Sequence, residues 1–301
     1  MRWVKQGCIF TPPPGPEWRS SHAALPVVER VEDRYRVYFS ARDPRDRASI
    51  GWFEFRVEEP GKILTVGEEP ALALGPLGAF DDCGVTSACL VRHEGRRYLY
   101  YSGWSLAVSV PFSFFVGLAV SEGDGEFRRA SAAPVLGRSA VDPYLTASPS
   151  VLVENGLWRM WYVSGTGWTL EQGQPQHHYH IRYAESRDGI KWQPTGIVCI
   201  DYADASENSL ARPYVLKDGG RYRMWYSRRG QAYRIGYAES DDGVRWQRRD
   251  GEAGIDVSDS GWDAEMIAYP CVFRHEGRLF MLYNGNGYGR TGVGLAVLAE
   301  G

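Results

Sequence analysis

The sequence predicts an all-β fold, a five-bladed β-propeller with about four antiparallel strands per blade around a central channel. The main observation is a unit that occurs five times, in which an apolar strand and a short turn, with glycine in four of the five units, precede an aromatic-rich strand. The aromatic-rich strands are Arg36–Ser40, Tyr98–Ser102, Met160–Ser164, Met224–Ser227 and Met281–Asn284. Aligned on Phe39, Tyr101, Tyr162, Tyr226 and Tyr283, the units are spaced by 62, 61, 64 and 57 residues. A repeat of this length indicates a propeller or a solenoid.

Two further observations support this fold class. The segments Tyr183–Gln193 and Tyr237–Gln247 match closely, and both contain Asp-Gly between aromatic-bearing runs. Asp-Gly is typical of a hairpin turn, because the turn needs a positive φ. Helical periodicity is nearly absent, since no run of about a dozen residues has apolar side chains at helical spacing.

The five units follow one another along the chain. The first, residues 18–57, is expected to have strands near Ala24–Glu32, Arg34–Ala41 and Ser49–Arg56. The others are expected at residues 80–129, 142–195, 207–249 and 262–300, and residues 1–10 could add a strand to the last unit and close the ring. We interpret residues 1–301 as a single domain, because propellers of this length are routinely one domain.

Two segments stand out from the repeat. Ser105–Phe115 is a long apolar insertion in the second unit, and Thr166–His178 is a loop rich in Gly, Gln and His in the third. Insertions of this kind usually cover a cavity mouth or an interface. We therefore expect both segments at the rim of a site.

Composition excludes several classes of function. The formal net charge of −3 argues against a nucleic-acid-binding protein, which would need a basic face. The first residues have no apolar signal region, and no run is long enough to span a bilayer, so we expect a cytoplasmic protein. The cysteines are odd in number and lack metal-type spacing, which favours buried reduced thiols. These are Cys8, Cys83, Cys89, Cys199 and Cys271.

A metal site is also considered at His177–His180. Here His178 and His180 would share one face of an extended segment, but no cysteine or carboxylate accompanies them at a fixed offset. A polar surface strand is the favoured interpretation, and no metal or cofactor is predicted.

Acidic residues recur at one end of the predicted inner strands. We align these strands on Pro26, Ala88, Pro149, Pro213 and Pro270. Carboxylates then lie five to seven residues upstream in four of the five units, namely Asp81, Asp82, Asp142, Glu207, Asp263 and Glu265. Because inner strands line a common channel, these acids are expected to converge at one mouth. Alternatively, they cap strand starts by accepting hydrogen bonds from turn amides.

A ring of acids suits glycosidic chemistry. Cleavage of a glycosidic bond needs one carboxylic acid to protonate the leaving oxygen and a second carboxylate as base or nucleophile. Crowding of like charges raises the pKa of some members of such a ring, which would keep one acid protonated near neutral pH.

Arginines and aromatic rings form the second group of candidates. The arginines at strand ends are Arg42, Arg212, Arg228, Arg229 and Arg290. If several face the channel, the ligand is an acidic sugar, such as a uronate or a phosphorylated sugar; otherwise they pair with the acids around the mouth. Rings that could stack on a sugar are Trp104, Tyr144, Trp168, Trp262 and Tyr288. Packing between blades explains most tryptophans, Trp104 and Trp168 excepted, because these two border the insertions.

On these motifs the chain resembles the five-bladed propellers of the glycoside hydrolase clan that includes families 32, 43, 68, 117 and 130, in particular bacterial glycosidase-like members of unassigned activity. The resemblance covers nearly the whole chain. It is carried by Phe80–Val85, Asp142–Pro149, Glu207 before Ala211–Pro213, and Gly261–Met266 before Tyr269 and Pro270.

The resemblance implies three catalytic roles. In the hydrolases of this clan, an aspartate of the first blade is base or nucleophile, an aspartate of a middle blade holds the acid or a sugar hydroxyl, and a glutamate of a later blade is the general acid. The middle-blade role falls to Asp142, and the general-acid role to Glu207 or, failing that, Glu265. No aspartate occurs between residues 18 and 28 to serve as the first-blade base. The titratable candidate near the channel end in this segment is His22. Imidazole titrates near the operating pH, so His22 could serve as base, or it is a histidine satisfied within the structure. Asp82 or Asp81 is the alternative base, and Asp81 and Asp263 are candidate substrate contacts.

The leading hypothesis is therefore a cytoplasmic carbohydrate-active enzyme that acts on a glycosidic or glycosyl bond of a small or oligomeric saccharide. The missing first-blade aspartate favours two alternatives. One is a non-hydrolytic enzyme of polysaccharide biosynthesis that performs transfer or cyclisation in the same pocket. The other is a non-catalytic propeller that binds a glycan or a saccharide-assembly partner.

Overall fold

The computed structural model describes residues 1–299, and nearly all of its regular structure is β-strand. We call the five groups of strands that follow the sequence repeat units 1 to 5. Unit 1 contains β2 (Ser21–Val31), β3 (Arg34–Arg42), β4 (Ala48–Phe55) and β5 (Ile63–Val66). Unit 2 contains β6 (Gly84–His93), β7 (Arg96–Leu106), β8 (Phe112–Glu122) and β9 (Arg128–Arg129). Unit 3 contains β10 (Thr146–Glu154), β11 (Leu157–Glu171), β12 (Gln174–Ser186) and β13 (Gln193–Ile200).

Unit 4 contains β14 (Ser209–Asp218), β15 (Arg221–Arg229), β16 (Tyr233–Ser240) and β17 (Gln247–Arg248). Unit 5 contains β18 (Ala268–His275), β19 (Arg278–Asn284) and β20 (Val293–Leu298), and β1 (Trp3–Phe10) pairs with β20. Among residues 1–299, helix is confined to three single-turn 3₁₀ segments, η1 (Glu17–Arg19), η2 (Asp250–Glu252) and η3 (Gly287–Gly289). The all-β prediction and the predicted extra strand at residues 1–10 are confirmed.

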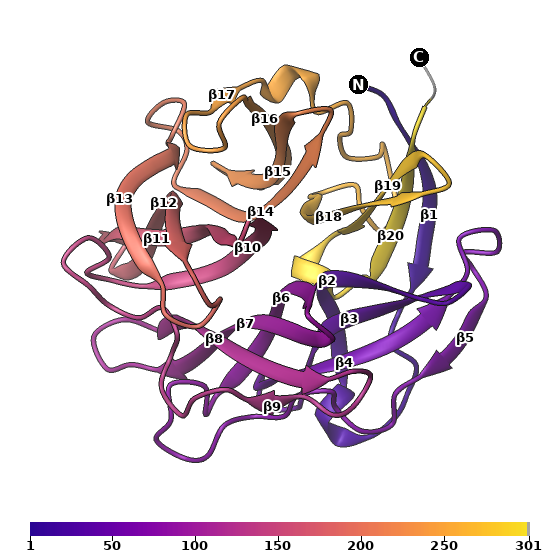
Figure 1. Cartoon of the computed structure of the whole chain (residues 1–301), viewed down its shortest axis with the longest axis horizontal. Helices are drawn as coiled ribbons and strands as arrows, with labels where there is room; N and C mark the ends of the chain where they lie inside the picture. The colour runs from indigo at the N-terminus through magenta and orange to yellow at the C-terminus, as the bar shows by residue number, and fades with distance from the viewer. Residues whose placement is uncertain (300–301) are drawn as a thin grey trace.

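The strands pair within units and form three open sheets. Units 1 and 2 are joined by one parallel residue pair, Ala48 with Gly84, and units 3 and 4 by another, Tyr179 with Ser209. Unit 5 and β1 make the third sheet. The units follow one another around a common centre, with β2, β6, β10, β14 and β18 innermost (Figure 1). The arrangement is propeller-like, while five separate blades and a single domain stay interpretations of the repeat.

Each inner strand bends at the position used to align the repeat. The pairing register shifts across Pro26, Ala88, Pro149, Pro213 and Pro270. In four of the five strands the residue before the proline has a positive φ, as in Ser148 (46°) and Tyr269 (60°). Such β-bulges re-aim the neighbouring side chains. The bulges therefore decide which side chains point into the centre.

Side chains at the end of the second strand hold four of these bulges in place. Ser40 Oγ accepts a hydrogen bond from Ser87 N at 3.0 Å, and Ser102 Oγ accepts one from Ser148 N at 2.8 Å. The equivalent bonds are Tyr269 N to Ser227 Oγ at 2.8 Å and Leu25 N to Asn284 Oδ1 at 2.8 Å. The last of these joins unit 5 to unit 1. In unit 3 the equivalent Ser164 donates instead to Asp142 Oδ1 at 2.6 Å.

Two predicted segments differ from their expected form. Residues 166–178 lie mostly within β11 and β12, which form one long hairpin that turns at Gln172 and Gly173, rather than a loop. Residues 105–115 likewise lengthen the hairpin of β7 and β8. Backbone pairing continues along β11 and β12 through the polar segment, and along β7 and β8 through the apolar segment, so both hairpins are long. In unit 1 the predicted strand limits are confirmed to within a few residues.

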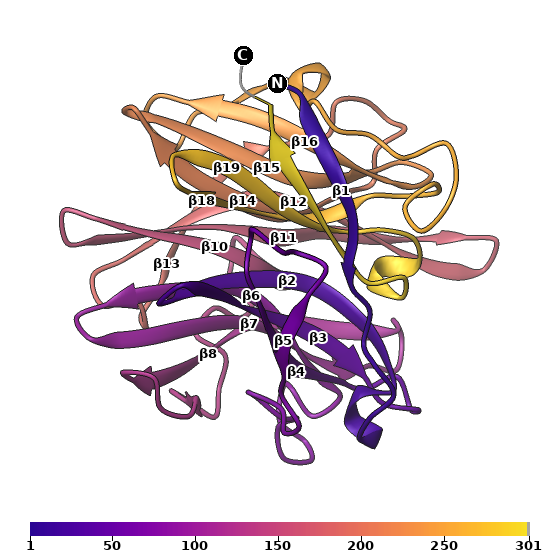
Figure 2. The ribbon, with the colours of Figure 1, turned by 90° about the vertical axis from the view of Figure 1, so that its right-hand side faces the viewer.

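The first and last strands, β1 and β20, lie side by side (Figure 2). The predicted end of unit 5, residue 300, lies outside the described residues. No helix among residues 1–299 has the length and apolar character to cross a membrane. All five cysteines are free, and Cys89, Cys199 and Cys271 are buried as expected, but Cys8 is exposed and Cys83 is partly exposed, so the expectation of burial is wrong for these two.

Candidate functional site

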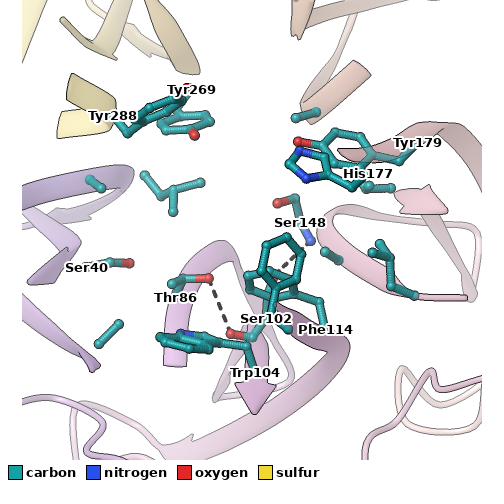
Figure 3. A pocket seen from close by; sticks show the side chains of 18 of the residues that line it. Ser40, Thr86, Ser102, Trp104, Phe114, Ser148, His177, Tyr179, Tyr269 and Tyr288 are labelled. Carbon is teal, nitrogen blue, oxygen red and sulfur yellow. Dashed lines mark hydrogen bonds between the residues drawn. The ribbon is translucent and has the colours of Figure 1, made fainter. Parts of the chain in front are cut away.

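A cavity of about 450 Å³ lies where the inner strands begin, and all five units contribute to its wall. Its lining combines hydroxyl groups with aromatic rings, as Figure 3 shows. The hydroxyls are those of Ser40, Thr86, Ser102 and Ser148, together with the phenols of Tyr179, Tyr233, Tyr269 and Tyr288. The other rings are Trp104, Phe112, Phe114 and His177. The wall is thus apolar over much of its area, with polar groups at separate points.

The serines of this wall come from the repeat itself. Ser40 and Ser102 are the last residues of the aromatic-rich strands, and their oxygens already accept hydrogen bonds from the bulges of the next unit. Thr86 Oγ1 donates to the carbonyl of Ser102 at 3.3 Å (Figure 3). Because these groups are held by the backbone, the polar points of the wall are fixed in position.

The two long hairpins meet beside the cavity. Phe112 of β8 lies 5.3 Å from Trp168 of β11 and 5.5 Å from His177 of β12, measured between ring centroids. Trp104 of β7 packs against Phe114 at 6.2 Å and lines the cavity, and its predicted contact with a sugar stays a prediction. The apolar insertion and the His-rich segment therefore build one wall together.

The charged side chains of the lining are Arg42, Asp46 and Arg229. Arg42 contacts Asp46 through Nη1 at 3.4 Å, and Asp46 is largely exposed. Arg229 Nε donates to Asn208 Oδ1 at 3.2 Å, and its Nη2 contacts Ser209 Oγ and His177 Nε2 at 3.1 Å each. The cavity therefore holds two guanidinium groups and one carboxylate.

His177 is the neutral member of this wall. Burial, the neighbouring Arg229 and His178 lower its pKa to about 4. At neutral pH the ring can therefore accept the hydrogen bond from Arg229. His178 and His180 lie on the face of β12 opposite to His177. His178 Nε2 lies 2.7 Å from Thr169 Oγ1, and His180 Nδ1 lies 3.2 Å from Asp201 Oδ1.

Three of the predicted acids are bound inside the units instead of facing the cavity. Asp81, Asp142 and Asp263 are each at most 1% exposed. Each accepts a hydrogen bond from the tyrosine of its own aromatic-rich strand, at 3.0, 2.9 and 3.0 Å respectively. Arg129 and Lys5 add ion pairs to Asp81 and Asp263, at 2.8 and 2.7 Å. The three aspartates thus share both an equivalent position in the repeat and a hydrogen bond from the tyrosine of their own unit.

The other predicted acids are also separate from the cavity lining. Both oxygens of Glu207 accept hydrogen bonds from Arg248, at 2.8 and 2.9 Å, and Arg228 lies 3.7 Å away. Glu265 is exposed. Asp82 Oδ2 accepts a bond from Gly78 N at 2.9 Å within a turn. The structure thus does not bring the six acids together around one space, and their predicted catalytic roles stay predictions.

His22 lies in β2 of unit 1, outside the residues that line the cavity, with a positive φ of 63° and 5% exposure. Burial, followed by the charges of Arg42 and Arg290, lowers its pKa to about 4, while Asp46 acts in the opposite direction. Its Nδ1 lies 2.9 Å from Ser21 Oγ. The ring is neutral at pH 7, but an imidazole with so low a pKa is a weak proton acceptor, so the role of His22 as base stays a prediction.

The predicted binding residues divide into two groups. Arg42 and Trp104 line the cavity. Arg212 is fully buried and donates to the carbonyl oxygens of Ala88 and Pro26, so it fills the centre between units 4, 1 and 2. Arg228, Arg290 and Tyr144 are outside the lining, and Arg290 and Tyr144 are exposed.

Sequence reasoning missed several residues of the wall. Ser40 and Ser102 could have been found as the fixed last positions of the repeat, and Tyr269 as the residue before an aligned proline. Arg229 was noticed only as one of several arginines at strand ends. Thr86 carried no signal, because a single threonine in a strand is common.

Comparison with known proteins gives two kinds of likeness. The chain is 48% identical over 299 residues to the uncharacterized protein Rv1502 of Mycobacterium tuberculosis strain H37Rv, covering 99% of both chains. The uncharacterized protein MT1551 of strain CDC 1551 is 47% identical over the same share. No family model matches the chain.

Solved structures share the fold at low sequence identity. One, a glycoside hydrolase, superposes with a TM-score of 0.76 at 17% identity and covers 99% of this chain and 92% of its own. A thermostable family-43 glycoside hydrolase gives 0.70 at 20% identity, covering 97% and 93%. An exo-1,5-α-L-arabinanase from a bovine ruminal metagenomic library gives 0.64 at 14% identity, covering 92% of each chain. The propeller-like fold is thus that of glycoside hydrolases.

Proposed function

The chain belongs to the family of the mycobacterial protein Rv1502, and from its glycoside hydrolase fold and its cavity we propose that it is a carbohydrate-active protein that binds a saccharide. The observation that carries the proposal is the lining of the central cavity. Its volume of about 450 Å³ lies in the range typical of small-molecule sites. The cavity suits one small saccharide or the end of a longer one.

The wall has the two kinds of group that a sugar needs. Aromatic rings such as Trp104 and Tyr269 offer flat apolar faces to the C–H side of a pyranose or furanose ring. Ser102, Ser148 and the tyrosine phenols offer hydrogen-bonding groups to its hydroxyls. Arg42 and Arg229 line the same space and argue for an acidic sugar among the candidates.

Binding is better supported than hydrolysis through two carboxylates. Both retaining and inverting hydrolysis use a pair of carboxyl groups that flank the scissile bond. Asp46 is the carboxylate of the cavity lining, whereas Asp142 and Glu207 are occupied by hydrogen bonds elsewhere. We therefore place recognition of the sugar first and hydrolysis or group transfer second.

One observation favours the second candidate function. Asp46 lines the cavity, and its charge acts on His22, whose pKa is lowered to about 4 by burial and by Arg42 and Arg290. Asp46 could supply an acid at the edge of the cavity, and the nearby imidazole of His22, outside the lining, could supply a weak base. Glycosyl transfer or hydrolysis at this edge is the corresponding alternative.

Calorimetric titration with a panel of neutral and acidic mono- and oligosaccharides tests the proposal. We expect saturable binding of at least one sugar class and a loss of at least tenfold in affinity for Trp104→Leu. The matched control is Trp52→Leu, which removes a ring outside the cavity and should leave affinity unchanged. Absence of binding by every sugar of the panel would contradict the proposal.

Aryl glycosides separate binding from catalysis. On the leading proposal they are bound but not turned over at an enzymatic rate. If they are hydrolysed, and Glu207→Gln lowers turnover by a factor of a hundred or more at unchanged affinity, the carboxylate mechanism would replace simple binding. The same loss in Asp46→Asn would assign the chemistry to the edge of the cavity near His22.

A further inference from the structure

One guanidinium of the cavity is held by neutral groups alone. The side chain of Arg229 bonds to Asn208, Ser209 and His177, and within residues 1–299 no carboxylate lies within 4.0 Å of it. It is partly buried, and its cation also lies over the ring of Tyr233, 5.3 Å from the centroid. A desolvated cation without a counter-ion attracts an anion strongly, because water no longer screens it.

The neutral partners leave part of the guanidinium available. The bonds to Asn208, Ser209 and His177 use Nε and Nη2. An arginine has five N–H donors in a planar fork, so Nη1 is not consumed by these three partners. Tyr288 lines the cavity (Figure 3). It is a fourth neutral partner of the guanidinium and takes at most one further N–H, so at least one of the five donors is left. These three bonds fix the plane of the group without neutralising it.

A free phenol lies close to the same charge. Tyr269 lines the cavity, and its backbone is fixed by the bulge and by the bond from its N–H to Ser227 Oγ. Its hydroxyl makes no hydrogen bond to any other residue in the described part of the chain. Burial raises the pKa of Tyr269, although Arg229 and Arg42 act in the opposite direction, so the phenol keeps its proton. Both guanidinium charges therefore act on one free O–H donor.

The balance of charge in the cavity favours an anion. Asp46 partly compensates Arg42, but that contact is long and the carboxylate is mostly in solvent. No equivalent carboxylate compensates Arg229 within the described residues. His177 is neutral at pH 7, so it neither adds a competing charge nor repels the guanidinium.

We propose that Arg229 and Tyr269, with Arg42 as the second cation of the wall, bind the anionic group of an acidic saccharide, a carboxylate or a phosphate monoester. The proposal rests on saccharide binding in the same cavity and adds the class of sugar and the residues that select it. Arg229 supplies a charged fork to the oxyanion, and Tyr269 supplies one O–H donor. Arg229 is then the residue that separates acidic sugars from their neutral counterparts.

The experiment compares matched sugars by titration calorimetry: a neutral hexose, its uronate and its 6-phosphate, in the gluco and galacto series, with inorganic phosphate as a separate probe. We expect an acidic member to bind at least tenfold more tightly than its neutral counterpart. A preference for the uronate identifies a carboxylate as the bound group, and a preference for the 6-phosphate identifies a phosphate. Equal binding of neutral and acidic members would overturn the anion site while leaving saccharide binding intact.

Variants assign the preference to residues. Arg229→Gln should remove the preference for the acidic member and change neutral binding less than threefold, and Arg229→Lys should restore part of it. Tyr269→Phe should weaken acidic binding several-fold with the ring retained. The matched control is Arg221→Gln, at the opposite end of β15, where the side chain pairs with Glu239 and Asp241 in solvent. It removes the same charge and should leave the preference unchanged.

The outcomes distinguish this proposal from saccharide binding in general. Persistence of the acidic preference in a folded Arg229→Gln variant would overturn the role of Arg229, and thermal unfolding confirms that the variant is folded. If no sugar binds but inorganic phosphate binds in an Arg229-dependent way, the anion site stands and the saccharide proposal fails. If neither sugars nor phosphate bind the unmodified protein, both proposals fail.

Discussion

Three aspartates at one position of the repeat have the same hydrogen-bond partner. Asp81, Asp142 and Asp263 each lie seven residues before an aligned position of the inner strand and each accept a bond from the tyrosine of their own unit. Asp142 also accepts a bond from Ser164 at 2.6 Å. A buried carboxylate with several donors stabilises the fold, because removal of its charge leaves those donors unpaired or poorly paired. The recurrence of acids along the chain therefore has a structural explanation at the scale of single residues.

This explanation predicts the effect of Asp142→Asn. We expect the free energy of unfolding to fall by about 2 kcal/mol, because the amide replaces a buried acceptor that serves three hydroxyl donors and lies near Arg182. Urea unfolding followed by tryptophan fluorescence measures the change. Asp259→Asn, at an exposed aspartate, is the control and should change stability by less than about 0.5 kcal/mol.

A purely catalytic role for Asp142 gives the opposite result. Stability would then be unchanged in Asp142→Asn, while turnover of a sugar substrate would fall by orders of magnitude. Measuring both quantities on the same preparation separates the two roles.

At the scale of elements, the third strand of four of the five units has a glycine opposite the aromatic ring of the second strand, whereas in unit 3 Tyr162 pairs with Arg182. Tyr101 pairs across the strands with Gly117, and Phe39, Tyr226 and Tyr283 pair with glycines in the same way. A Cβ added to Gly117 would lie 2.2 Å from Cζ of Tyr101. The ring that donates to Asp81 therefore occupies the space above the glycine. Glycine at this position is required by close packing, not by a turn.

The expected consequence is a strong effect of one methyl group. Gly117→Ala should lower the free energy of unfolding by about 1–3 kcal/mol, because the ring of Tyr101 must move and its bond to Asp81 is disturbed. Chemical denaturation measures this loss. Gly167→Ala in β11 is the control, since a Cβ there meets no atom within 4 Å. Equal stability of the two variants would show that the ring tolerates the added group.

At the scale of the whole molecule, the last unit is fastened to the first by both backbone and side chains. β1 pairs with β20 of unit 5, while Phe10 at its end stacks on Phe53 of unit 1 at 4.0 Å and lies 5.1 Å from Phe39. Asn284 of unit 5 adds the bond to Leu25 N of unit 1. The first ten residues thus contribute to the contact between the two ends of the chain.

Truncation of the stacked ring tests this connection. Phe10→Ala should lower the free energy of unfolding by about 3–5 kcal/mol, because Phe10 is only 4% exposed and the cavity left behind lies between two units. Val4→Ala in the same strand removes a side chain that is 40% exposed and should cost much less. A similar small loss for both variants would show that unit 5 is held to unit 1 without this packing.

Much of the fold could be predicted, because the repeat is defined by residues that are close together in the sequence. The aromatic-rich strands and the Asp-Gly turns each depend on neighbouring residues in the chain, whereas the bulges at the aligned positions were not predicted. The site was harder to predict. Acids at equivalent repeat positions were expected to converge on a channel, but Asp142 is turned into its own unit by Tyr162, and Glu207 is held by Arg248. Whether a side chain faces the centre or its own strand depends on partners that are distant in sequence.

The sequence by itself determined the all-β class, the repeated units and the aromatic positions that fill the core, since strand periodicity and turn residues act over short distances. Only the tertiary structure decided which polar groups share the cavity. Arg212 closes the centre through carbonyls of units 1 and 2, whereas Arg229 reaches the cavity with neutral partners. Both arginines occur near strand ends in the sequence. Burial and long-range hydrogen bonds give Arg212 a structural role, whereas the neutral partners of Arg229 leave its charge available for a ligand.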